Sequence, residues 1–96
     1  MAYRVRWSPR AADDLEGIAE YISLDSPAYA TSVVKTIVEI TRKFSQFPLA
    51  GRKVPEFNDE QIREWFAYDY RIIYRLDQNT VTVAAIVHGR RMLSLD

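Results

Sequence analysis

Cysteine is absent from the sequence, and its absence excludes disulfide bonds, thiolate metal ligands and cysteine nucleophiles. Histidine occurs once, so a zinc site has almost no ligands to draw on, and we expect no metal and no cofactor. No apolar run approaches the roughly 20 residues that a membrane-spanning helix needs. The first residues also lack the long apolar stretch of a secretory signal. We therefore expect a cytoplasmic protein that does not interact with membranes.

An excess of charge of either sign is missing too. Lys and Arg together number 13, as do Asp and Glu, for a formal net charge of zero. Nucleic-acid-binding domains are usually basic because neutralising phosphates provides most of their affinity. The balance therefore disfavours specific DNA binding by this chain. Charge is nevertheless local: residues 13–25 contain acidic but no basic residues, which we interpret as a solvated face, whereas arginines gather in the last third.

What remains is the composition of a folded protein. The 96 residues are 48% hydrophobic and 12% aromatic, which fits one folded domain spanning residues 1–96. No glycine-rich phosphate loop and no Ser–His–acid arrangement is evident, so no familiar catalytic motif suggests a reaction.

The first half of the chain has the pattern of a strand followed by two helices. Residues 3–7 alternate as an amphipathic strand does. Ser8-Pro9 and Ser26-Pro27 are helix starts, and apolar residues at helical spacing then run to about Ile22 and Ser45. So short a link between the helices predicts an antiparallel hairpin. Gly17, unfavourable inside a helix, is interpreted as the mark of a close helix–helix contact.

From residue 62 onward the period changes to two. The stretch before it, with Pro55, is expected to be irregular, and Arg52 and Lys53 are interpreted as ordinary loop charges. The predicted strands are Ile62–Ala67, Tyr70–Leu76 and Thr80–His88, with a hairpin loop at residues 77–79. The fold class is therefore α+β: an N-terminal strand and an antiparallel two-helix hairpin packed on one face of a mainly antiparallel four-stranded sheet.

Alternation in the middle strand assigns side chains to the two faces of this sheet. Residues 70, 72, 74 and 76 are apolar or aromatic and should pack on the helices. Arg71, Ile73 and Arg75 should then lie on the uncovered face, where both arginines can meet an anion or the acidic groups of a partner. The alternative is a solvated face with ion pairs to Glu64 or Asp69.

Four stretches along nearly the whole chain form an ordered set of landmarks. They are Val5–Ala11 with Asp14-Leu15 and Ile18–Ile22, then Phe47–Arg52, Tyr70–Arg75 and Val87–Arg91. Each is weak alone, but in this order and at these separations they resemble the RelE/ParE superfamily of bacterial toxins from type II toxin–antitoxin pairs. The resemblance implies a cognate antitoxin as partner in a hetero-oligomer.

The superfamily contains two activities, and a residue-by-residue comparison indicates which of them this chain resembles more. RelE-like members cut messenger RNA in the ribosome, whereas ParE-like members poison DNA gyrase. Arg71 and Arg91 match the arginines of RelE-like enzymes, but the lysines of the preceding strand are replaced by residues 62–66, which include Glu64. The late tyrosine has no counterpart up to Asp96. We favour a ParE-like gyrase inhibitor that is not an enzyme.

A ribosome-dependent messenger RNA endonuclease remains the alternative, with Arg71, Arg75, His88 and Arg91 as its reduced site. In that role His88 would be a general acid or base, whereas in the simpler interpretation it orders the turn at Gly89. A third possibility is a non-toxic member that only binds its antitoxin. For the favoured function, the residues expected to contact gyrase or the antitoxin are Trp65, Arg71, Arg75, Arg90, Arg91, Met92, Leu93 and Leu95.

Overall fold

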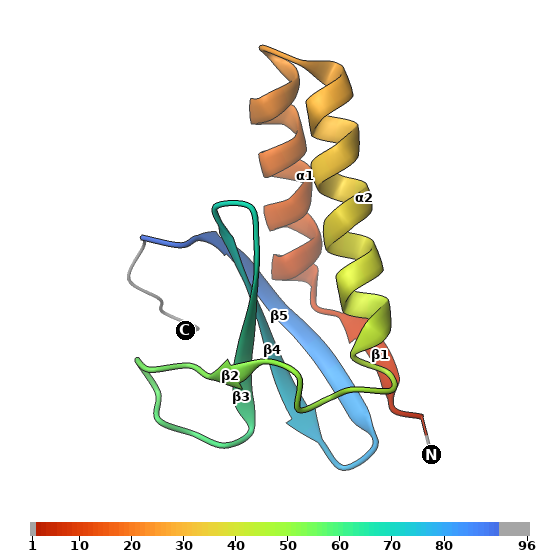
Figure 1. Ribbon diagram of the computed structural model, residues 1–96, viewed down its shortest axis with the longest axis vertical. Coiled ribbons are helices and arrows are strands. Elements are labelled where there is room, and N and C mark those ends of the chain that lie inside the picture. Colours follow the sequence, from red (N-terminus) through yellow and green to blue (C-terminus); the bar gives the residue numbers. More distant parts are fainter. Residues whose placement is uncertain (1, 91–96) are drawn as a thin grey trace.

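The computed structural model describes residues 2–90, and these form an α+β fold in which a helical hairpin stands against a sheet (Figure 1). Of the predicted strands, Ile62–Ala67 and Thr80–His88 have the expected bounds, and the others differ by a residue at one end. The elements, in order, are β1 (Arg4–Trp7), α1 (Pro9–Ser23), α2 (Pro27–Lys43), β2 (Arg52–Lys53), β3 (Ile62–Ala67), β4 (Tyr70–Asp77) and β5 (Thr80–His88).

The sheet is mixed and has five strands in the order β1-β5-β4-β3-β2, so the prediction of four strands was wrong. The missed strand, β2, is only two residues long and pairs antiparallel with β3, too short to show a period in the sequence. β1 runs parallel to β5, and the other neighbours are antiparallel.

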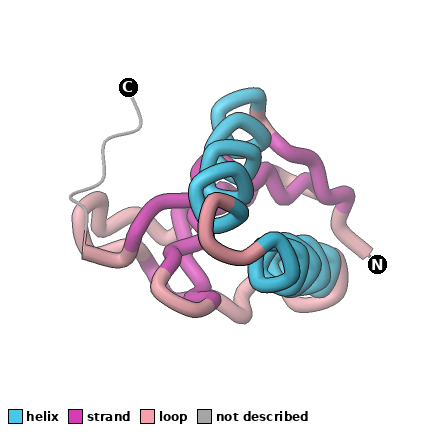
Figure 2. The backbone as a smooth tube through the Cα atoms, turned by 90° about the horizontal axis from the view of Figure 1, so that it is seen from above, coloured by secondary structure: helices cyan, strands magenta, loops and turns pink. Residues whose placement is uncertain are grey.

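Both helices begin at the predicted serine caps. The Ser8 hydroxyl accepts the Ala11 N–H at 3.0 Å, and that of Ser26 accepts the Tyr29 N–H at 3.1 Å. The helices lie side by side, joined at one end by a short connection (Figure 2). That end projects beyond the sheet (Figure 1), which leaves Tyr21 73% and Leu24 82% exposed. Apart from its chain neighbours and the backbone of its own helix, nothing lies within 4 Å of a Cβ placed on Gly17, so the expected close helix contact there was wrong.

The main core lies between the hairpin and the sheet. As predicted, residues 70, 72, 74 and 76 of β4 face the helices, and the Tyr74 ring stacks on Phe44 with ring centroids 4.0 Å apart. Neither α1 nor α2, the helices of residues 2–90, combines the length and the hydrophobicity that a membrane span requires.

The other face of the sheet carries a second, smaller core, so the expectation that this face is uncovered was wrong. Val54 and Phe57, in the segment between β2 and β3, pack there against Ile73, Ala85 and Val87. The segment is held by backbone hydrogen bonds from the Val54 N–H to the Ile62 carbonyl and from the Phe57 N–H to the Val54 carbonyl. The sequence feature that indicates this second core is the presence of Val54 and Phe57, large apolar residues in a stretch that otherwise looks irregular.

Candidate functional site

A buried network of charges lies on the sheet face away from the helices. Glu64, at the centre of β3, is 1% exposed and Arg71, on β4, is 5% exposed. One Glu64 oxygen accepts the Arg71 Nε–H at 2.6 Å, and the other accepts the Arg52 Nε–H of β2 at 2.6 Å. Glu64 thus joins the three neighbouring strands β2, β3 and β4 through its two carboxylate oxygens.

Glu56 completes the network from the segment that covers this face. Its carboxylate accepts two hydrogen bonds from the Arg71 guanidinium, at 2.7 and 2.8 Å, in the parallel geometry that makes such pairs strong. These bonds raise the pKa of Arg71 above its ordinary value, burial opposes the rise, and the bond to Glu64 adds to it. Two arginines and two glutamates therefore balance within one small volume.

This arrangement contradicts the placement of Arg71 on an open face and confirms its ion pair with Glu64. Asp69, the other expected partner, instead accepts the Gly89 N–H through its backbone carbonyl at 2.7 Å. The sequence analysis missed Arg52 and Glu56 as partners. Glu64 itself was the useful feature, because an acidic residue that alternates in phase with Ile62 points into the sheet face and requires a cation there.

Arg75 lies on the same face as Arg71 but is exposed. No ion pair forms at its guanidinium among residues 2–90. Arg75, two residues along β4 from the network, therefore presents its charge to solvent, as the sequence predicts.

Trp65 and Phe66 are adjacent in β3 and therefore point to opposite faces of the sheet, yet neither side chain is buried in a core. Trp65 is 42% and Phe66 48% exposed. β2 pairs only with Arg63 and Glu64, so the edge of β3 beyond them has no neighbouring strand. With Ala50 and Arg52 these aromatics line a groove of about 330 Å³, and the Arg52 guanidinium lies over the Phe66 ring, 5.4 Å from its centroid.

His88 lies at the end of β5 on the helix-side face. It pairs in register with Tyr70, and the two rings meet edge to face at 6.0 Å. Its Nδ1 accepts the Arg90 N–H at 3.4 Å, a local turn contact that fits the simpler interpretation. Arg71 pairs with Val87, which belongs to the core of the other face. Arg71 and His88 therefore point away from each other across the sheet.

The remaining predicted residues lie at the end of the chain. Arg90 is exposed just after β5. Arg91, Met92, Leu93 and Leu95 lie outside the described residues. Over residues 2–90, no three His, Cys, Asp or Glu side chains are grouped so that they could hold a metal ion.

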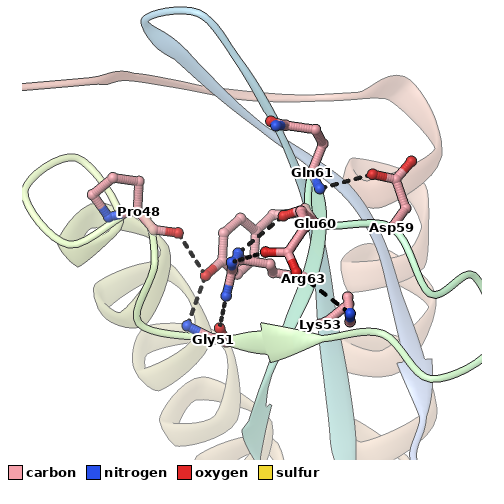
Figure 3. A network of polar contacts seen from close by, with 8 residues as sticks. Pro48, Gly51, Lys53, Asp59, Glu60, Gln61 and Arg63 are labelled. Carbon is pink, nitrogen blue, oxygen red and sulfur yellow. Dashed lines mark hydrogen bonds and ion pairs between the residues drawn. The ribbon is translucent and has the colours of Figure 1, made fainter.

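The segment before β2 is fixed to the sheet by a second set of polar contacts (Figure 3). The Tyr74 hydroxyl accepts the Gly51 N–H at 2.8 Å and donates to the Pro48 carbonyl at 2.9 Å. Arg63 donates to the Gly51 carbonyl at 2.9 Å and pairs with Glu60 at 3.3 Å. These bonds place β2, and with it Arg52, beside Glu64.

Comparisons with solved structures show the same fold in toxin–antitoxin proteins. A chain of the chromosomal ParDE system of P. aeruginosa is 22% identical, with a TM-score of 0.72 over 91% of this chain and 96% of that one. A chain of the RelBE2 toxin–antitoxin complex of Mycobacterium tuberculosis is 23% identical, with a TM-score of 0.67 over 92% and 99%. A chain of the YoeB dimer of Staphylococcus aureus is 18% identical, with a TM-score of 0.64 over 92% of this chain and 98% of that one.

Sequence comparisons complete the assignment. A search of curated protein sequences gave no match. The family model described as the ParE toxin of the type II toxin–antitoxin system parDE, in contrast, matches residues 5–93, nearly the whole chain. The recognised resemblance is thereby confirmed, and the chain belongs to the ParE toxin family of type II toxin–antitoxin systems.

Proposed function

We propose that this toxin acts on DNA gyrase as an inhibitor that is not itself an enzyme, and that a cognate antitoxin neutralises it. The observation that carries the proposal is the engagement of Arg71 by two carboxylates. Arg71 corresponds to the middle-strand arginine of RelE-like nucleases, so its surroundings distinguish the two activities.

Cleavage of RNA by its 2′-hydroxyl needs a base, cations for the charge that develops on phosphorus, and an acid for the leaving oxygen. Arg71 directs its guanidinium to Glu64 and Glu56 at 2.6 to 2.8 Å. A phosphate approaching Arg71 would meet these carboxylates first and would be repelled. Releasing Arg71 would also leave Glu64 buried with one cation fewer, which is costly.

The position of His88 argues in the same direction. A nuclease site built from Arg71 and His88 needs both side chains around one phosphate. They lie on opposite faces of the sheet, because Arg71 pairs with Val87 and His88 with Tyr70. The general acid–base candidate and the buried cation therefore cannot serve one reacting group in this arrangement.

An antitoxin partner is supported by the relatives and by the surface. The similar chains from P. aeruginosa and Mycobacterium tuberculosis come from toxin–antitoxin systems. Apolar side chains exposed in contiguous patches mark binding surfaces. The large apolar and aromatic side chains exposed among residues 2–90 are Tyr21, Leu24, Tyr29, Phe47, Leu49, Trp65, Phe66 and Tyr68. Of the predicted contact residues, Trp65, Arg75 and Arg90 are exposed and available.

The test is to induce this chain alone in a bacterial host and to follow labelled thymidine and labelled methionine. We expect DNA synthesis to stop first while protein synthesis continues, and purified protein to block gyrase supercoiling. Supercoiling that stays unaffected at any achievable concentration would overturn the gyrase assignment.

The ribosome is the competing target, and the exposed Arg75, a cation that could contact RNA, is the feature that favours it. An early collapse of methionine incorporation, with messenger RNA cut within codons only when ribosomes are present, would establish it. Normal growth with undiminished incorporation of both labels, by contrast, would identify a non-toxic member that only binds its antitoxin.

A further inference from the structure

A groove of about 520 Å³ opens between α1 and the ends of β4 and β5. Ile18 of α1 and Ile86 of β5 supply apolar lining, and Tyr21, Tyr70 and His88 supply aromatic walls. Gly17 also lines the groove, and nothing lies within 4 Å of a Cβ placed on it. The missing side chain therefore helps to keep the groove open.

The groove runs along the part of β5 that β1 leaves uncovered. β1 pairs with β5 only as far as Trp7 and Val83, after which the chain turns into α1. Two side chains then take over the edge: the Ser8 hydroxyl donates to the Ala84 carbonyl at 3.0 Å, and an Asp14 oxygen accepts the Ile86 N–H at 2.9 Å. The edge is thus capped over its first part only.

The backbone groups that follow point into the groove. Because the Ile86 N–H points away from β4 toward Asp14, the Ile86 carbonyl and the His88 N–H point the same way. A residue of an added parallel strand, placed opposite Val87, could donate to that carbonyl and accept from that N–H. This is the pairing that a peptide uses when it extends an exposed sheet edge.

The charge at the groove is acidic. Asp13 and Asp14 line it, and residues 13–25 contain no Lys or Arg. Asp14 has a partner in Arg10, 3.7 Å away, whereas no ion pair forms at Asp13 among the described residues. Such an edge favours an incoming segment with Lys or Arg beside its apolar residues and disfavours an acidic one.

We propose that this groove receives an extended, basic segment of the antitoxin, which adds as a strand to the free end of β5 in continuation of β1. The inference rests on the proposed antitoxin partnership. It also reverses the sign of charge expected for the antitoxin segment. Of the two sheet-face arginines that were to attract acidic segments, Arg71 is neutralised by Glu56 and Glu64 and Arg75 stays exposed, whereas the open edge of β5 is acidic. A second copy of this chain fits poorly because its own acidic α1 would meet this one.

The test measures binding of the full-length antitoxin encoded by the gene adjoining this toxin's, by titration calorimetry. Gly17→Phe should fill the groove, and Asp13→Lys should reverse its charge. We expect each to raise Kd by about tenfold or more. The matched controls on exposed positions of α2, Ser32→Phe and Glu39→Lys, should leave Kd within about twofold of wild type. Circular dichroism checks that all four variants fold.

Hydrogen exchange supplies a readout of the strand itself. The His88 amide should become protected when the antitoxin binds, whereas the Ile86 amide, already bonded to Asp14, should change little. Tight binding that neither groove variant weakens, with His88 unprotected, would overturn the inference and leave the antitoxin partnership intact. If the wild-type chain and every variant fail to bind, the antitoxin partnership itself fails.

Discussion

Glu64 and Arg71 face the same side of neighbouring strands, and the Arg71 Nε lies 2.6 Å from a Glu64 oxygen. Both side chains are almost completely buried, and Arg52 and Glu56 balance their charges. Removing one charge of such a buried pair strongly lowers the free energy of unfolding, because the remaining charge stays buried without compensation. We therefore expect the main effect of substitutions in this network to be a lower free energy of unfolding.

Glu64→Gln should lower the free energy of unfolding by about 3 kcal/mol or more, because buried Arg71 would lose a charged partner in a dry site and the more exposed Arg52 would lose its partner too. Urea denaturation followed by tryptophan fluorescence measures the change. Glu60→Gln is the matched control, since Glu60 pairs with Lys53 and Arg63 at the exposed surface and should shift stability by about 0.5 kcal/mol at most. Equal effects of the two variants would contradict the assigned importance of the buried pair.

Much of the fold could be predicted because its cues are local. The Ser-Pro pairs at residues 8–9 and 26–27 set both helix starts within a few residues of sequence. Alternation over Ile62–Ala67 and Thr80–His88 gave those strand bounds directly. Each cue depends on neighbours along the chain, so no knowledge of tertiary contacts was needed.

The features that were missed depend on contacts between distant residues. Arg71 draws one partner from 7 residues away and another from 15, and neither is indicated by the strand pattern around it. The cover over that face comes from a segment whose own pattern is irregular. Ala84 is a further case: the register shifts there, so that Ile73 faces Ala85 and Tyr74 faces Val83. Ser8, far away in sequence, bonds to the Ala84 carbonyl.

Tyr74→Phe should lower the free energy of unfolding by about 1 to 3 kcal/mol, because the buried Gly51 N–H would lose its acceptor. Tyr68→Phe is the control, since among residues 2–90 the Tyr68 hydroxyl meets only Thr36, at 3.4 Å on the exposed surface, and its loss should cost about 0.5 kcal/mol or less. Thermal or urea unfolding of the two variants gives the comparison. A Tyr74→Phe protein as stable as wild type would mean that the segment before β2 is held otherwise.

The same hydroxyl predicts a dependence on alkaline pH. Burial raises the pKa of Tyr74 above its ordinary value of 10.0, although the Gly51 hydrogen bond and Arg63 oppose the rise. The folded chain therefore holds this proton more tightly than the unfolded chain. The resulting stabilisation is complete below pH 10.0 and is lost as the pH rises through the raised pKa. The free energy of unfolding of Tyr74→Phe should fall less steeply at alkaline pH than that of wild type. The part of the loss that remains is due to Tyr70, whose pKa burial also raises.

Ser8→Ala should cost more than Ser26→Ala, although both residues cap a helix. Ser26 makes one exposed cap bond, and its loss should cost about 1 kcal/mol. Ser8 caps α1 and in addition donates to the Ala84 carbonyl, so its replacement should cost about 2 kcal/mol. Urea unfolding of the two variants measures the difference. Equal losses would show that the bond to Ala84 contributes nothing to stability.

Gly17 and Gly51 should respond to alanine in opposite directions. A Cβ at Gly17 meets nothing within 4 Å, and alanine is the better helix former, so Gly17→Ala should raise the free energy of unfolding by about 0.5 to 1 kcal/mol. A Cβ at Gly51 would press on the Glu64 carbonyl and lie 2.7 Å from the Tyr74 hydroxyl, atoms of the same network that positions Arg52. Gly51→Ala should therefore lower the free energy of unfolding by about 1 to 3 kcal/mol. A Gly51→Ala protein as stable as wild type would show that β2 can move away from β3 without loss of stability. The hydrogen bond from Arg52 to Glu64 would then matter less than its short distance implies.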